Sequence, residues 1–93
     1  MTNTNYLEVI QNIAYAFTDK GIPYTMNSCC DGWQLRFPWC NGDMVCHSWS
    51  YGNEIGYVET MGFPWDDKDE AGVTVHSPEE VIDLVSNYYG KVG

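Results

Sequence analysis

Hydrophobic positions recur at helical spacing near both ends of the chain and alternate with polar positions in between. From residue 5 to residue 20, apolar side chains fall on one side of a helix and polar ones on the other. Asn5 followed by Glu8 is a typical N-cap signal. Gly21 and then Pro23 indicate where the helix stops. The pattern therefore predicts a first helix over residues 5–20.

A second helix is indicated by the run Ser77-Pro78-Glu79-Glu80. The serine is a capping residue, the proline suits the first helical position, and Glu80 is placed to complete a capping box. We expect this helix to end at Gly90. Its predicted apolar side consists of Val81, Ile82, Leu84, Val85, Tyr88 and Tyr89.

Alternating positions from Trp33 to Tyr51 predict a β-hairpin turned near Asn41-Gly42. A two-residue turn would place Pro38 at a site that needs an N–H donor, which proline lacks. A three-residue loop with a bulge at Gly42 avoids this conflict and pairs Trp39 with Asp43. In that register one face carries Trp33, Leu35, Phe37, Trp39, Val45, His47, Trp49 and Tyr51.

Three further strands complete the predicted sheet. Residues 23–30 form a strand that ends at an Asp31-Gly32 turn, and residues 55–61 form another after a turn at Gly52-Asn53. Residues 73–76 are a short edge strand. The predicted fold class is α+β, in the order α-β-β-β-β-(β)-α, with an antiparallel meander and both terminal helices on one face. Residues 1–93 are expected to form a single domain, with a radius of gyration of about 12 Å.

The charge balance excludes two classes of partner. Thirteen Asp and Glu residues against four Lys and Arg residues give a formal net charge of −9. The predicted order resembles that of double-stranded-RNA-binding domains, but the basic patch that nucleic acid requires is missing. Anionic membrane surfaces are excluded for the same reason. The charge favours solubility and a basic partner.

The start of the chain has no basic region followed by an apolar run, and no apolar stretch reaches membrane-spanning length. We therefore expect neither a secretory signal nor a membrane anchor. The expected location is the cytoplasm, where cysteines stay reduced.

The cysteines and histidines suggest two kinds of chemistry. Four cysteines are present, but without zinc-knuckle spacing, and adjacent Cys29 and Cys30 in a strand would point to opposite faces. We therefore predict no metal site and no cofactor. Cys46 and His47 diverge in the same way, although His47 can meet Cys30 across strands. A small-ligand or enzymatic cleft beside His47 thus stays open as an alternative to the commoner core histidine.

No recognisable catalytic or calcium-binding motif is present. Counted from Asp67 as an EF-hand loop, Gly72 takes the glycine position, but Pro78 stands where the bidentate glutamate is required. Walker, GxGxxG, GxSxG and HExxH patterns are absent from the sequence. We predict no catalytic residues and expect a protein that is not an enzyme.

The acidic residues near the C-terminus are the predicted partner-binding site. Seven carboxylates and one lysine lie between positions 66 and 83. Their summed potential could imitate the phosphates of nucleic acid, and neighbouring aromatic side chains would serve as anchors. The predicted partner-binding residues are Asp66, Asp67, Asp69, Glu70, Glu79, Glu80, Asp83, Trp65 and Phe63.

Two segments, YVETMGFPWDD (57–67) and TVHSPEEVIDLV (74–85), resemble small acidic uncharacterised proteins of phages and mobile elements, including anti-CRISPR-type inhibitors. The resemblance implies a non-enzymatic inhibitor or adaptor that binds a basic, nucleic-acid-handling host protein, for example a CRISPR effector. It also implies that the expected cytoplasmic location is the host cell cytoplasm. A structural homo-oligomer, joined through an aromatic sheet face or an edge strand, is a further alternative.

Overall fold

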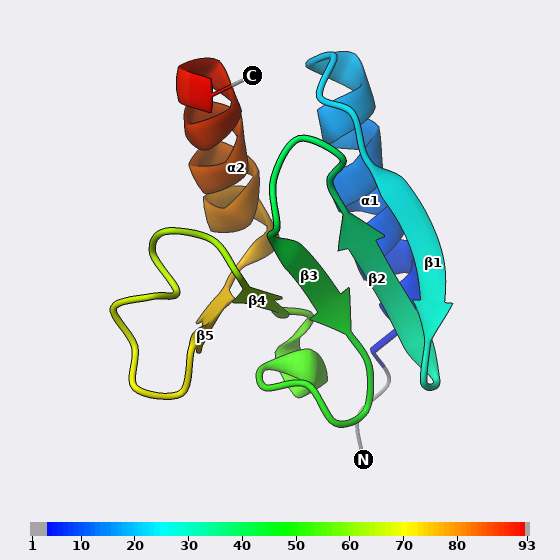
Figure 1. The fold of residues 1–93 in the computed structure, drawn as a ribbon. Coiled ribbons are helices and arrows are strands. Elements are labelled where there is room, and N and C mark those ends of the chain that lie inside the picture. Colours follow the sequence, from blue (N-terminus) through cyan, green and yellow to red (C-terminus); the bar gives the residue numbers. More distant parts are fainter. Residues whose placement is uncertain (1–3, 93) are drawn as a thin grey trace.

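The computed structural model describes residues 4–92, so positions 1–3 and 93 of the predicted domain lie outside the described residues. The chain is an α+β fold in the predicted order (Figure 1). The radius of gyration is 12.2 Å, as expected for one compact unit. No helix within residues 4–92 is long and apolar enough to cross a membrane. The elements are α1 (Tyr6–Asp19), β1 (Thr25–Cys29), β2 (Gly32–Arg36), β3 (Asp43–Cys46), a 3₁₀ turn η1 (Asn53–Ile55), β4 (Val58–Met61), β5 (Val73–His76) and α2 (Pro78–Val92).

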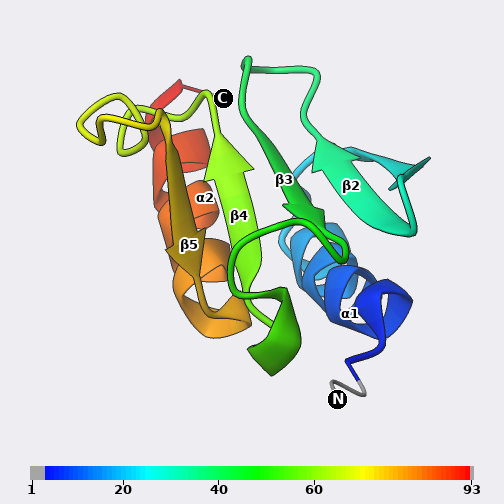
Figure 2. The same cartoon turned by 90° about the horizontal axis from the view of Figure 1, so that it is seen from below.

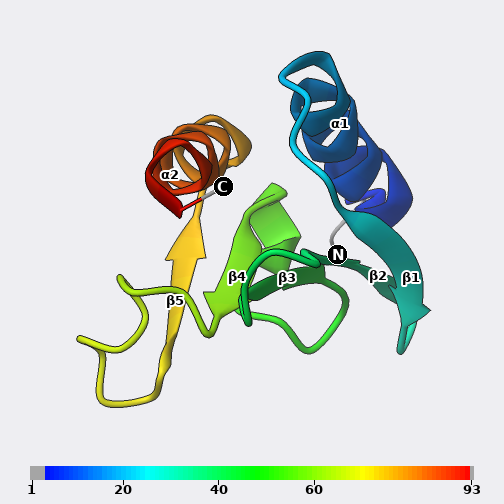
Figure 3. The ribbon, with the colours of Figure 1, turned by 45° about the horizontal axis from the view of Figure 1, so that its top comes forward.

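The five strands form one antiparallel meander in the order β1-β2-β3-β4-β5. Both helices lie on the same face of this sheet and leave the other face open, as Figure 3 shows. Ile13 and Phe17 of α1 and Val85 of α2 are fully buried against the sheet. The short predicted strand at residues 73–76 is confirmed as β5, an edge strand paired only with β4.

The predicted helix signals hold at three of the four ends. The Asn5 side chain accepts a hydrogen bond from the Glu8 amide at 3.0 Å. Gly21 takes a left-handed conformation, and Ile22 N donates to Phe17 O, which satisfies the last carbonyls of α1. Ser77 Oγ accepts from the Glu80 amide at the start of α2.

The predicted end of α2 at Gly90 is wrong, because the helix continues to Val92. The Glu80 carboxylate also differs from the expected capping box: it lies 2.9 Å from His76 Nδ1. The serine cap is therefore formed, whereas the glutamate holds the strand that precedes the helix.

The predicted register of the β2–β3 hairpin is wrong. Arg36, not Trp39, is opposite Asp43, and Leu35 is opposite Met44, so residues 37–42 form a longer loop. Met44 and Cys46 consequently share the buried face with Leu35, while Val45 belongs to the open face. A shift that exchanges the two faces of a strand follows from its period of two.

The cause of this register is tertiary. Phe37 leaves the strand and is buried, and the Trp39 ring packs 4.9 Å from the ring of Tyr89 on α2. Trp39 Nε1 also donates to Pro23 O at 2.9 Å. Burial of these large rings against the helices outweighs the strand pairing that a shorter turn would preserve. Trp49 and Tyr51, expected on the tryptophan-lined inner face, are instead exposed beyond the end of β3.

The turn between β1 and β2 also differs by one position from the prediction. Cys29 is opposite Gly32, so the turn residues are Cys30 and Asp31 rather than Asp31 and Gly32. A Cβ atom on Gly32 would lie 2.0 Å from Cys46 O and 2.7 Å from His47 Cα. Gly32 is therefore required where the two hairpins approach each other, and the turn forms ahead of it.

Candidate functional site

The predicted aromatic anchors of the acidic surface belong to the core. Phe63 is fully buried and stacks on the half-buried Trp65, with ring centroids 4.5 Å apart. Trp65 Nε1 donates to Thr60 Oγ1 at 3.1 Å. A fully buried ring cannot contact a partner, so the predicted anchor role of Phe63 is wrong, whereas that of the half-buried Trp65 stays a prediction.

The prediction that Asp66 contacts a partner is also wrong, because its side chain is 0% exposed. Its carboxylate accepts hydrogen bonds from Thr60 Oγ1 at 2.8 Å, Thr74 Oγ1 at 2.5 Å and Phe63 N at 3.1 Å. A buried carboxylate with three donors is fully occupied inside the protein. Asp66 therefore holds the loop at residues 62–72 against β4 and β5 and does not face a partner.

The six remaining predicted carboxylates are exposed but do not form one surface. Asp67, Asp69 and Glu70 lie in the loop before β5, whereas Glu79, Glu80 and Asp83 lie on α2 after it. Figure 2 shows this loop and the start of α2 at opposite ends of β5. The chain brings the two groups together in sequence, and the strand between them separates them in space.

Glu79 lines a groove between the two helices together with Glu8, which is not among the predicted partner-binding residues. The groove has a volume of about 570 Å³, within the range of ligand-binding pockets. Glu8 from α1 and Glu79 from α2 are its exposed carboxylates. Apolar side chains of α1, η1 and α2 form the rest of the wall, together with polar groups from the start of α1. The lining residues are Thr4, Asn5, Glu8, Val9, Asn12, Ile13, Ile55, Gly56, Pro78, Glu79 and Ile82.

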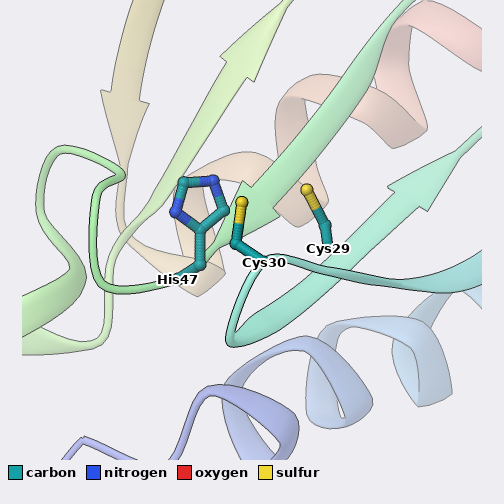
Figure 4. Close-up of side chains that lie close together, drawn as sticks. All are labelled: Cys29, Cys30 and His47. Atoms are coloured by element: carbon teal, nitrogen blue, oxygen red, sulfur yellow. The ribbon is translucent and has the colours of Figure 1, made fainter.

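Two thiols and one imidazole form a second cluster on the open face of the sheet. One ligand atom each from Cys29, Cys30 and His47 lies within 4.8 Å of the others. Figure 4 shows all three side chains on the same side of the ribbon, with Cys30 between Cys29 and His47. Cys30 has a φ of 59°, so it turns out of the strand direction and its thiol follows that of Cys29. The expectation that adjacent cysteines diverge is wrong for this reason, whereas the expected meeting of His47 with Cys30 is confirmed.

Hydrogen bonds from backbone amides to side chains hold this cluster in place. The Asp31 carboxylate, in the β1–β2 turn, accepts from the Ser48 amide at 2.9 Å. This bond lowers the pKa of Asp31 below its ordinary value, because the ionised carboxylate is the better acceptor. Within the loop after β3, Trp49 N donates to His47 Nδ1 at 3.1 Å. The neutral ring therefore carries its proton on Nε2.

The four thiols differ in exposure and in ionisation. Burial raises the pKa of Cys46 to about 11, and the Cys46 thiol donates to Tyr57 O. Burial also raises the pKa of Cys40, and burial together with the neighbouring Cys30 thiol raises that of Cys29. Cys30 is the exposed cysteine of the four. Since the thiolate is the reactive form, Cys30 is the most accessible nucleophile and Cys46 the least.

This ranking gives a direct prediction. When the folded chain is treated with iodoacetamide near neutral pH under reducing conditions, we expect Cys30 to be alkylated first and Cys46 to stay unmodified. Peptide mapping by mass spectrometry measures each site, and the chain unfolded in guanidinium is the control in which all four cysteines react. Modification of Cys46 as fast as Cys30 in the folded chain would contradict the burial of that thiol.

A chain of hydrogen bonds runs from Glu80 through His76 and Thr74 to Asp66. It resembles a catalytic triad, but the hydroxyl does not donate to the imidazole as a nucleophile would. Glu80 Oε1 lies 2.9 Å from His76 Nδ1, and His76 Nε2 lies 2.6 Å from Thr74 Oγ1. The Thr74 hydroxyl donates its hydrogen bond to the Asp66 carboxylate. His76 Nε2 is therefore the donor in its bond to Thr74 and does not activate that hydroxyl as a base would. The network joins β4, β5, the loop and α2, and its role is structural.

A comparison with protein-family models, curated proteins and solved structures finds no match for this chain. The structure defines a small acidic α+β protein with an inter-helix groove and a thiol–imidazole cluster on different faces of one sheet.

Proposed function

We propose that this protein is a non-enzymatic inhibitor or adaptor that binds a basic partner through the inter-helix groove. The observation that supports this most is the pairing of Glu8 and Glu79 in the groove beside an apolar wall. A lysine or arginine side chain has an apolar stem and a cationic head, and such a wall with carboxylates at its edge suits both parts. In this proposal the acidic docking surface is centred on the groove rather than on the whole stretch from residue 66 to residue 83.

The charges around the groove favour this class of partner. Neither Glu8 nor Glu79 forms an ion pair with a lysine or arginine of residues 4–92. Glu80 and Asp83 are exposed on the same helix as Glu79 and add to the negative potential. A net charge of −9 extends this potential beyond the groove and would steer a basic protein towards it.

The class of basic partner follows from the resemblance of residues 57–67 and 74–85 to small phage proteins of the anti-CRISPR kind. Proteins that handle nucleic acid present basic grooves, and a compact acidic domain competes for such a groove through charge. Our proposal is therefore a host nucleic-acid-handling protein, such as a CRISPR effector, as the target.

Neutralising the groove tests this proposal. We expect the double variant Glu8→Gln with Glu79→Gln to bind an oligo-arginine peptide roughly two- to tenfold more weakly than the native chain, the loss that two exposed ion pairs account for. Fluorescence anisotropy at low and high salt measures the affinity. Binding by the native chain should weaken as salt rises, because the interaction is between exposed charges.

The matched control is Asp67→Asn with Glu70→Gln, which removes the same charge from the loop at the far end of β5. Glu8 and Glu79 lie in first helical turns, where an acid contributes about 0.3–1 kcal/mol to stability. Circular dichroism is therefore needed to establish that each variant folds. Equal weakening by both pairs would mean that net charge alone governs binding and that the groove has no special role. Binding of the native chain that is unaffected by salt would remove the proposal altogether.

A further inference from the structure

We propose that Cys29, Cys30 and His47 form a binding site for a thiophilic d¹⁰ cation, with three protein ligands and an open fourth position. This site lies apart from the inter-helix groove and does not depend on it. The ligand atoms come from two hairpin elements that the chain brings together: both thiols from the end of β1 and its turn, and the imidazole from the residue after β3.

The distances suit such an ion. Metal–sulfur bonds of about 2.3 Å and metal–nitrogen bonds of about 2.0–2.1 Å place the ligand atoms about 3.6–4.0 Å apart around one centre. The three ligand atoms here all lie within 4.8 Å of one another. Side-chain rotations that move each ligand atom by less than about an ångström are therefore enough to bind an ion, and the strands need not move.

The scaffold around the site is built for close approach. Gly32 leaves no room for a Cβ between the β1–β2 turn and the His47 backbone. The Asp31 carboxylate holds the Ser48 amide at 2.9 Å and thereby fixes the loop that carries His47. These two contacts hold the turn that carries Cys30 beside the loop that carries His47, as a preorganised ligand set requires.

The ligand types select the class of ion. Two thiols and an imidazole favour soft or borderline cations such as Zn(II), Cd(II) and Cu(I) over Mg(II) or Ca(II), which prefer oxygen ligands. Cys30 is exposed and Cys29 and His47 are half-buried, so solvent reaches the site and can occupy the fourth position. A site with three protein ligands and an accessible position differs from a closed structural zinc site.

Binding requires a defined movement of protons. Both thiols lose their protons to solvent as the two metal–sulfur bonds form. The His47 proton moves from Nε2 to Nδ1, which frees the Nε2 lone pair for the metal and breaks the hydrogen bond from the Trp49 amide. Trp49 lies in an exposed part of the loop, so its amide is then hydrated by solvent.

A titration of the full chain, with its cysteines kept reduced, tests the site. Cd(II) is added as the metal alone and followed through thiolate-to-metal charge-transfer absorption, and Zn(II) and Cu(I) are measured by competition with a chromophoric chelator. We expect saturation at one ion per chain. Cys29→Ser, Cys30→Ser and His47→Asn should each lower the affinity at least tenfold, since even residues that only orient metal ligands contribute about ten- to a hundredfold.

The variants are chosen to separate ligand loss from unfolding. Asparagine at position 47 keeps an acceptor for the Trp49 amide in the manner of an Asx turn but removes the Nε2 ligand. Cys40→Ser is the matched control, because Cys40 is half-buried, lies outside the cluster and accepts a hydrogen bond from Gly42 N. Circular dichroism establishes that every variant folds.

Three results would overturn the proposal. The first is a His47→Asn variant that binds the metal ions as tightly as the native chain, which would mean that the two thiols bind without the imidazole. The second is an equal loss in Cys40→Ser, which would indicate non-specific binding to thiols. The third is no saturable binding of any of the three ions by the reduced native chain.

Discussion

Replacing Phe63 by alanine is expected to lower the free energy of unfolding by about 3–5 kcal/mol, the range for large aromatic side chains removed from a core. Phe63 is 0% exposed. Its ring stacks on Trp65 and makes edge contacts with Phe37 at 5.8 Å and Tyr88 at 6.1 Å between centroids. The ring therefore joins the long β2–β3 loop, the loop before β5 and α2.

The effect should be at the upper end of that range because the surroundings of Phe63 cannot collapse easily. A Cβ on Gly42 would lie 2.5 Å from the Phe63 ring, so the loop backbone rests directly against it. Alanine at position 63 leaves a cavity bounded by backbone on one side and by the rings of Phe37, Trp65 and Tyr88. Guanidinium unfolding, analysed as a two-state transition, measures the change.

Trp49→Ala is the control for this measurement. Trp49 is an even larger aromatic residue but is 79% exposed, so its removal should change stability by less than about 0.5 kcal/mol. A Phe63→Ala protein as stable as Trp49→Ala would mean that the aromatic cluster around residues 37, 63, 65 and 88 does not form as described.

Replacing Asp66 by asparagine is expected to lower the free energy of unfolding by about 2–4 kcal/mol, although the two side chains have the same shape. Three donors converge on the Asp66 carboxylate: two threonine hydroxyls and the Phe63 amide. An asparagine amide puts an NH₂ group where one carboxylate oxygen accepts. At least one buried donor then faces another donor and is left unsatisfied.

Asp67→Asn is the control for this substitution. Asp67 is the next residue along the chain and is exposed, so the same chemical change should alter stability by less than about 0.5 kcal/mol. Urea unfolding of both variants, at one pH and one salt concentration, gives the comparison. If Asp66→Asn and Asp67→Asn have the same stability, the carboxylate at position 66 is not the centre of a buried network.

The candidate sites could be predicted only in part. The acidic stretch at residues 66–83 predicts Glu79 as a site residue. Glu8 lines the same groove but lies 71 positions earlier, and no local signal links the two. Asp66 and Asp67 are neighbours with the same side chain, yet one is buried and the other exposed. The sequence predicts both as surface charges. The two threonines that donate to Asp66 come from separate strands, so no local pattern marks Asp66 as buried.

The thiol–imidazole cluster shows a similar limit. The sequence allowed His47 to meet Cys30 but made Cys29 diverge from Cys30, since regular strands alternate. The left-handed conformation of Cys30 removes that alternation at the turn. The turn sits at Cys30-Asp31 because the space beside Cys46 and His47 accepts only glycine at position 32.

The sequence by itself determined the α+β class, the order of the elements and the capped start of each helix. Those features depend on interactions within a few residues: side-chain periodicity, an N-cap hydrogen bond, and the conformational preferences of glycine and proline. Only the tertiary structure decided the hairpin register, the burial of Asp66 and Phe63, the groove beside Glu8 and the grouping of Cys29, Cys30 and His47. Each of these depends on side chains distant in sequence that compete for the same interior space, and no local pattern contains the outcome of that competition.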